Sequence, residues 1–97
     1  MHETVVLPCP EQVKPFRQNK ETICIDKGIA ETISKFWEKG FISLGCCQGD
    51  KEKGLNPDIV LPETYDEVKI QEVKIFLSSI DDREWNLLQW QWKLVRV

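Results

Sequence analysis

The segment Gly45–Asp50 carries the pattern in this chain that connects most readily with binding chemistry, a Gly-Cys-Cys-Gln-Gly-Asp turn. Two glycines let a backbone approach a ligand closely, and successive N–H groups of such a turn can form an anion-binding nest. We therefore expect a small ligand, for example a phosphorylated one, to bind at Gly45, Cys46, Cys47, Gln48, Gly49, Asp50, Lys51 and Lys53. The alternative is structural: Cys46 is a small core residue, Cys47 is half-buried, and the glycines only turn the chain.

Metal binding is a second chemistry that these thiols allow. Zinc sites use about four Cys, His or carboxylate ligands, usually with two of them in a close C-x-x-C pair. Cys46 and Cys47 fit this poorly, because adjacent residues of a strand point to opposite faces. Segment 8–12 reads Pro-Cys-Pro-Glu-Gln, half of a zinc knuckle with Gln12 in place of its second Cys. Zinc is thus a weaker hypothesis, with the candidate ligands Cys9, Cys24, Cys46, Cys47 and Asp50.

Tryptophan is frequent, with 4 in 97 residues: Trp37, Trp85, Trp90 and Trp92. Such residues usually pack in a core. Trp90 and Trp92 share one face of an expected strand, so the alternative is an exposed surface for a protein or a stacked base. If that strand is a sheet edge, the same rings can form the seam of a homo-oligomer.

Catalytic residues are scarce. The single histidine is His2, at a chain end where fraying is common. Without a second histidine, the Ser-His and Cys-His nucleophile arrangements have little to work with. No phosphate-binding P-loop and no dinucleotide glycine fingerprint occur. The sequence therefore predicts that the protein is not an enzyme.

Charge and hydropathy narrow the partners. The formal net charge is −3 and the sequence pI about 5.1, so the chain has no global field to hold duplex nucleic acid. The sequence contains no apolar run of about 18 residues and so predicts no membrane span. The N-terminus lacks signal-peptide features. We expect a cytoplasmic protein with reduced thiols, whose partner is a small-molecule ligand or another protein.

The elements that must position these residues follow from periodicity. Alternating or β-branched runs predict strands at Thr4–Leu7, Thr22–Ile25, Phe41–Cys46, Asp58–Leu61 and Leu88–Leu94. Apolar residues at helical spacing predict helices at 26–39 and within 65–80. Asp26 is the expected N-cap of the first helix and Gly40 its C′ residue.

The element order β-β-α-β-β-α-β predicts a single α+β domain over residues 1–97. Its expected architecture has two layers, a mixed β-sheet with two helices on one face. The charged turn Asp81–Glu84 is expected to be solvated.

Across residues 22–97 the sequence resembles small uncharacterised proteins of phages, prophages and Gram-positive bacteria. The resemblance rests on these segments: Cys24–Ala30, Gly40–Asp50, Pro57–Val60, Arg83–Trp85 and Leu88–Trp90. Members of that group that look metal-binding combine a C-P-x-C knuckle with a Cys-Cys-x-Gly-His turn. Here Gln12 and Asp50 stand at two of those ligand positions. A fainter similarity reaches the tRNA wybutosine-synthesis methyltransferases, and we carry no activity across.

The resemblance implies a phage-related protein in the host cytoplasm. Phages use small accessory proteins to disarm host defences, by sequestering nucleotide-derived signals or by blocking a defence protein. Our leading hypothesis is a non-enzymatic module that sequesters a small ligand. The alternatives are an inhibitor or adaptor that binds a host protein through Trp90 and Trp92, a structural zinc-binding domain, and an RNA-modification accessory.

Overall fold

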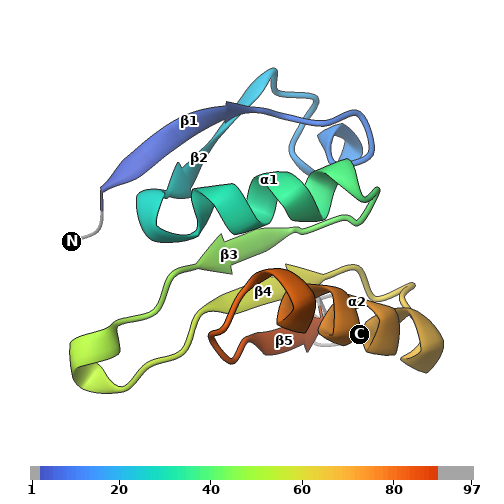
Figure 1. The fold of residues 1–97 in the computed structure, drawn as a ribbon. Coiled ribbons are helices and arrows are strands. Elements are labelled where there is room, and N and C mark those ends of the chain that lie inside the picture. Colours follow the sequence, from blue (N-terminus) through green and yellow to red (C-terminus); the bar gives the residue numbers. More distant parts are fainter. Residues whose placement is uncertain (1–2, 90–97) are drawn as a thin grey trace, which may run out of the picture.

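The computed structural model describes residues 3–89, in which five strands and two helices alternate in the order expected for an α+β protein (Figure 1). The strands are β1 (Thr4–Pro8), β2 (Thr22–Asp26), β3 (Gly45–Cys47), β4 (Asp58–Leu61) and β5 (Asn86–Gln89). The helices are α1 (Ala30–Glu38) and α2 (Glu67–Ile80). Three short 3-10 turns complete the list: η1 (Lys14–Phe16), η2 (Lys27–Ile29) and η3 (Lys51–Lys53).

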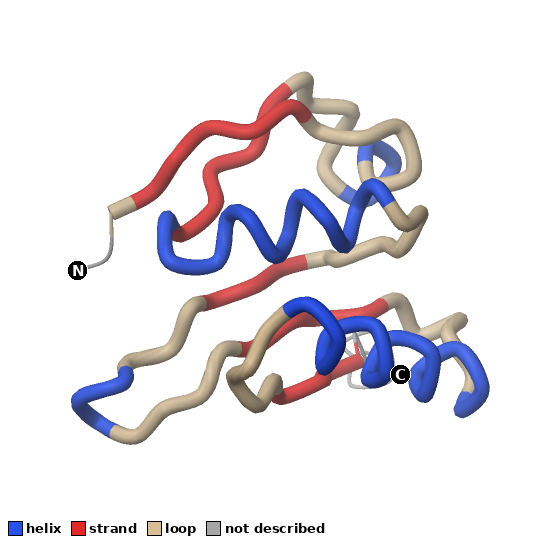
Figure 2. The backbone as a smooth tube through the Cα atoms, viewed as in Figure 1, coloured by secondary structure: helices blue, strands red, loops and turns tan. Residues whose placement is uncertain are grey.

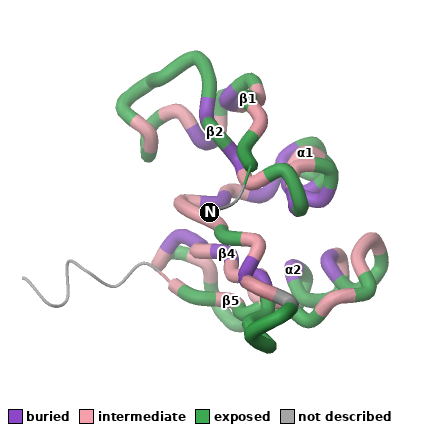
Figure 3. The backbone as a smooth tube through the Cα atoms, turned by 90° about the vertical axis from the view of Figure 1, so that its left-hand side faces the viewer, coloured by how far each residue is buried: buried purple, intermediate pink, exposed green. Residues whose placement is uncertain are grey.

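The strands form two sheets rather than the one mixed sheet that we expected. β1 and β2 pair antiparallel, whereas β4 lies between antiparallel β3 and parallel β5. β2 lies beside β3, but no hydrogen-bonded ladder joins these two strands. Both helices lie on the same side of the strands, as Figure 3 shows. The two-layer arrangement with its helices on one face therefore has a split strand layer.

The split begins in segment 41–44, which we predicted to be part of a strand. Three of its backbone groups bond to side chains, while the Phe41 and Leu44 amides donate to the Phe36 and Val60 carbonyls. The carbonyl of Phe41 accepts from Gln12 Nε2 at 3.3 Å, and the amide of Ile42 donates to the Tyr65 hydroxyl at 2.9 Å. The Leu44 carbonyl accepts from Arg17 Nη1 at 3.1 Å. Because these groups are already satisfied, the strand starts only at Gly45, and that prediction was four residues too early.

The core lies between the helix layer and the strand layer. Alternate strand residues face the helices, for example Ile25 in β2 and Ile59 in β4, both at most 4% exposed. The predicted α1 stripe is buried as Ile29, Ile33, Phe36 and Trp37. Phe36 packs on Phe41 with ring centroids 4.9 Å apart, and Phe41 packs on Phe76 of α2 at 5.6 Å. These three rings connect the two helices.

The helix ends follow local chemistry. Gly40 has a φ of +99° just beyond α1, which confirms the C′ residue expected from the sequence. The Asp66 side chain caps α2 by accepting the Lys69 amide at 2.9 Å. α2 therefore begins at Glu67, two residues into the segment in which we expected it.

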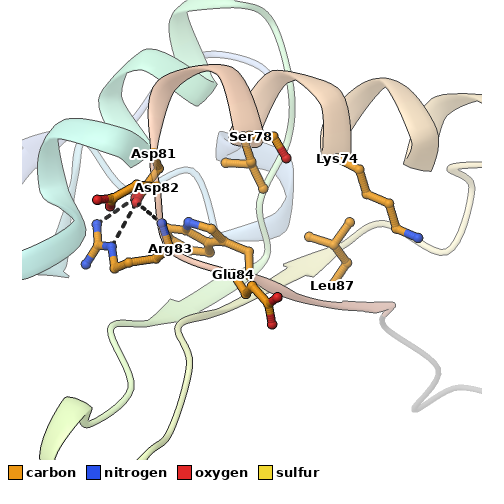
Figure 4. A pocket seen from close by; sticks show the side chains of 9 residues that line it. Lys74, Ser78, Asp81, Asp82, Arg83, Glu84 and Leu87 are labelled. Atoms are coloured by element: carbon orange, nitrogen blue, oxygen red, sulfur yellow. Dashed lines mark hydrogen bonds and ion pairs between the residues drawn. The ribbon is translucent and has the colours of Figure 1, made fainter.

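The turn after α2 was expected to be solvated, which holds for the exposed Asp82 and Glu84, whereas Asp81 and Arg83 form a hydrogen-bonded hub (Figure 4). The Asp81 side chain is only 4% exposed. Its carboxylate accepts from Arg83 Nη2 at 2.7 Å and from Thr32 Oγ1 of α1 at 2.9 Å. Arg83 Nη1 in turn donates to the Gly28 carbonyl at 3.1 Å. One carboxylate thus ties the end of α2 to the start of α1.

The hub makes stability depend on pH. Hydrogen bonds from Arg83 hold the pKa of Asp81 well below its ordinary value of 3.8. The charged form is the one stabilised, so its contribution is present above about pH 4 and falls as the pH drops further. We expect Asp81→Asn to lower the free energy of unfolding by about 2 kcal/mol at pH 7, and by roughly half as much at pH 3, because at pH 3 only the unfolded-state carboxyl has largely gained its proton. Urea denaturation at both pH values measures this difference.

The neighbouring substitution Asp82→Asn is the control, because Asp82 is exposed. It should change stability by no more than about 0.5 kcal/mol at either pH. Equal losses for the two variants at pH 7 would contradict the assignment of the hub to Asp81.

Candidate functional site

The turn that follows β3 is bound to the start of α1. The Gln48 amide donates to Asp26 Oδ2 at 3.0 Å, and the Gly28 amide donates to Gln48 Oε1 at 2.9 Å. Asp26 was expected to cap the first helix, but it makes no side-chain capping bond there. Instead, the side-chain oxygen of Gln48, which lies 20 residues further along the chain than Gly28, is the acceptor at the start of that helix. The Asp26 carboxylate already occupies the position at the Gln48 amide where we expected a ligand anion.

The loop between β3 and β4 is closed on itself and projects from the body of the molecule (Figure 2). The Asp50 amide donates to the Leu55 carbonyl at 3.0 Å, and the Leu55 amide returns a bond to the Asp50 carbonyl at 2.8 Å. Asp50 Oδ1 accepts the Glu52 amide at 3.0 Å. Gly49 is buried at the base of this loop, whereas Lys53 is exposed. The predicted site residues 45–53 are therefore spread along a strand, a buried turn and a projecting loop.

A cleft of about 200 Å³ lies where β2 and β3 fail to pair. Two residues of the predicted site, Gly45 and Cys46, line it. The full lining is Arg17, Ile23, Cys24, Ile25, Trp37, Ser43, Leu44, Gly45 and Cys46. Arg17, Trp37 and Ser43 were not predicted as site residues. Arg17 comes from the irregular segment between β1 and β2, and nothing in its sequence context marks it.

Hydrogen-bond donors converge on this cleft. Cys9 donates to the Glu21 carbonyl and Lys27 to the Glu3 carbonyl, so the odd-numbered residues of β2 bond to β1. The amide of Cys24 therefore points to the opposite edge, toward β3. Trp37 Nε1 donates to Ser43 Oγ at 2.9 Å, and both side chains are buried. The Ser43 hydroxyl keeps its own hydrogen for a further acceptor.

Arg17 is the only charged residue that lines the cleft. One guanidinium nitrogen, Nη1, donates to the Leu44 carbonyl at 3.1 Å and fixes the side chain across the opening. A guanidinium has five N–H donors in a planar fork, so most of them remain for an anion.

The four cysteines are free thiols in different environments. Cys9 is buried in the core, and burial raises the pKa of its thiol. Burial also raises the pKa of the Cys46 thiol to about 12, with the Asp26 carboxylate acting in the same direction. Cys24 and Cys47 are exposed. The structural alternative placed Cys46 in the core and Cys47 half-buried, whereas Cys46 is partly buried and Cys47 is exposed.

The predicted zinc ligands Cys9, Cys24, Cys46, Cys47 and Asp50 do not come together. Within residues 3–89 no group of three or more His, Cys, Asp or Glu side chains is placed to hold a metal ion. Gln12 and Asp50, which stand where the C-P-x-C and Cys-Cys-x-Gly-His pattern has metal ligands, make hydrogen bonds within the protein instead. Gln12 Nε2 donates to the Trp37 carbonyl at 2.9 Å near the end of α1, and Asp50 closes the projecting loop.

The remaining tryptophans divide between the described and undescribed parts of the chain. Trp85 is partly buried and packs against the core, to which the buried Trp37 belongs. The predicted interface residues Trp90 and Trp92 lie outside the described residues, as does His2.

Comparison with known proteins gives no family for this chain: no family model, curated protein or solved structure matches it. Among the helices of residues 3–89, none has the length and apolar character needed to cross a membrane.

The thiol environments predict selective alkylation. A pKa of about 12 leaves roughly one Cys46 thiol in ten thousand ionised at pH 8, and the thiolate is the reacting species. Iodoacetamide should therefore modify exposed Cys24 and Cys47 well before Cys46 and Cys9. Peptide mass spectrometry over a time course measures the four rates. Rapid modification of Cys46 in the folded protein would contradict its placement.

Gly49 and Gly54 form a matched pair for testing the loop, because each has a φ of +72°. A Cβ on Gly49 would collide with the Leu55 carbonyl oxygen and lie 2.6 Å from that of Asn56, whereas one on Gly54 meets nothing within 4 Å. Gly54→Ala should cost about 1 kcal/mol, for the backbone conformation alone. Gly49→Ala should cost at least about 2 kcal/mol more by urea denaturation. Equal losses would show that the base of the loop is not tightly packed.

Proposed function

We propose that this protein is a non-enzymatic binding module that holds a small anionic ligand in the cleft between β2 and β3. The observation that carries the proposal is the unbalanced charge of Arg17, since no carboxylate is among the residues that line the cleft. An arginine fork favours carboxylates and phosphates, which it can contact through two parallel hydrogen bonds. The Ser43 hydroxyl and the Cys24 amide supply neutral donors on either side.

The neutral thiol of Cys46 is compatible with an anionic ligand in the cleft. A thiolate there would repel a negatively charged ligand. With a pKa of about 12 the thiol keeps its proton at physiological pH, so Arg17 faces no negative charge from the lining residues. Burial of Cys46 thus keeps a further negative charge out of the cleft, where the Asp26 carboxylate and Arg17 already act on this thiol in opposite directions.

The volume of the cleft limits what it encloses. About 200 Å³ is smaller than the roughly 300–1,000 Å³ of sites that bury a drug-sized molecule. The cleft therefore takes an anionic group, such as a phosphate, and the rest of a larger ligand lies outside it. A nucleotide-derived signal has this form. Sequestration of such a signal as a phage counter-defence remains the biological setting that the sequence resemblance favours.

The test is binding of inorganic phosphate and nucleoside monophosphates, measured by two-dimensional NMR of the full chain. We expect saturable shifts at Ser43, Leu44 and Gly45, and at least about a tenfold loss of affinity in Arg17→Gln. Lys20→Gln is the control, because Lys20 is an exposed cation in the same connection and does not line the cleft. Absence of saturable shifts in the native protein, or equal losses in both variants, would overturn the proposal.

A protein partner is the second candidate function, favoured by the sheet face opposite the helices. Val6 of β1 is 63% exposed and Leu88 of β5 is 48% exposed on this uncovered face. A host protein or a second copy of the chain could cover it, together with the predicted surface of Trp90 and Trp92. Phosphate-independent association in sedimentation experiments would favour this function over the first.

A further inference from the structure

Strand β1 lies at the margin of the molecule, and in the described part of the chain its one hydrogen-bonded neighbour is β2 (Figure 1). The ladder to β2 uses the odd-numbered residues of β1, as the bonds at Glu3 and Cys9 on either side of the strand show. The backbone groups of Thr4, Val6 and Pro8 therefore point away from β2, to the open edge. This edge presents two amides and three carbonyls, because proline has no N–H.

The open edge of β1 lacks the features that usually prevent strand pairing. Natural proteins block such edges with charged side chains, internal prolines, bulges or a covering element. β1 reads Thr-Val-Val-Leu-Pro, without a charge, and its register with β2 is unbroken over all five residues. Its proline is the last residue and faces the open edge, where the ladder to β2 needs no N–H. Val6, at the middle of the strand, is 63% exposed. This edge is therefore suited to pairing with another strand.

We propose that two copies of this chain pair through β1, antiparallel and with Val6 opposite Val6 of the partner copy. In this register the Val6 amide and carbonyl of each copy bond to those of the other. Each Thr4 amide donates to the carbonyl of the partner's Pro8, so every amide of the edge gains an acceptor. The missing N–H of Pro8 leaves the Thr4 carbonyl, at the end of the ladder, to water. The pairing has two-fold symmetry, so one edge serves both copies.

The exposed valines select this register. A register centred on Val5 would also give four hydrogen bonds within β1, but it would place each Val6 opposite Thr4 of the partner copy. With Val6 at the centre, the two valines lie side by side on the sheet face that the helices leave uncovered, and each shields the other from water.

Charges at the ends of β1 favour a second copy as the partner. In this pairing Glu3, whose side chain is 81% exposed beside Lys27, lies opposite Cys9 of the other copy. Burial is the main influence on the pKa of the Cys9 thiol, and next come the cations Lys14 and Arg17, whose effect exceeds that of the nearby carboxylates. Each Glu3 carboxylate therefore approaches a positive region of the partner, and the two-fold axis repeats this contact.

The pairing leaves the Arg17 cleft open, because the cleft lies along the opposite edge of β2. Two copies form one antiparallel sheet in the order β2-β1-β1-β2, with a cleft at each outer edge. The inference is therefore independent of the proposed function, and a failure of the pairing would leave phosphate binding unaffected.

The test is sedimentation velocity of the full chain between about 10 µM and 1 mM. A single strand edge is a small interface, so we expect a reversible dimer with a dissociation constant of roughly 0.1 mM. Val6→Lys sets two ammonium groups opposite each other at the centre of the seam and should weaken the dimer at least about tenfold. Leu88→Lys is the matched control, because Leu88 is also an exposed apolar residue of the uncovered face, and it should leave the dimer unchanged.

Cross-linking tests the register. Cys24, which faces Val6 across the hairpin, and the exposed Cys47 are first replaced by serine. In that background Val6→Cys should give a disulfide-linked dimer on oxidation, because the two Cα atoms of a hydrogen-bonded pair lie about 5.5 Å apart. Thr4→Cys is matched in strand and in exposure, but its two Cα atoms would lie roughly 14 Å apart, too far for a disulfide.

Three results would overturn the proposal. One is a native chain that stays monomeric over the whole concentration range. Another is a dimer that Leu88→Lys disrupts as strongly as Val6→Lys, because the uncovered sheet face is then the interface. The third is a dimer in which Val6→Cys forms no disulfide. Far-UV circular dichroism verifies that each variant is folded.

Discussion

The split strand layer depends on two hydrogen bonds made by Gln48, one with Asp26 and one with Gly28. They join β2 and β3 at one end, where the Gln48 amide meets the Asp26 carboxylate and the Gln48 side chain accepts from Gly28. A Cβ on Gly28 would lie 2.5 Å from Gln48 Oε1, so any larger residue at this position would displace the Gln48 side chain. Arg17 bridges the cleft elsewhere through the Leu44 carbonyl. The cleft exists because side chains, and not a ladder, span this gap.

Much of the fold was predictable because it rests on local periodicity. Strand β4 has the predicted bounds, and the α1 stripe and Gly40 follow from helical spacing and from the freedom of glycine to adopt a positive φ. The failures involve polar side chains that bond to distant backbone. Gln12 and Tyr65 satisfy segment 41–44, and Gln48 takes the capping role expected of Asp26. Sequence spacing carries no information on such pairings, because their partners are 20 or more residues apart.

The candidate site was predictable only in part, for the same reason. The turn chemistry pointed to Gly45 and Cys46, which line the cleft, but gave no indication of Arg17, whose contact with Leu44 spans 27 positions. The burial of Asp81 was not predicted because nothing in the sequence distinguishes it from the adjacent Asp82. Only the fold shows that Thr32 and Arg83 surround the first carboxylate and leave the second exposed.

The break between β2 and β3 also divides the chain into two consecutive pieces, each of which contains all the strands of its own sheet. Each sheet therefore assembles within its own piece of the chain, and its longest pairing, between β4 and β5, spans 28 positions, from Asp58 to Asn86. The two pieces share one core, in which Ile25 of β2 and Ile59 of β4 belong to the same cluster, and the Asp81 hub also joins them. Because no hydrogen-bonded ladder joins β2 to β3, side-chain contacts alone hold this boundary closed, and an opening of the native state that begins there would widen the cleft before either sheet is lost.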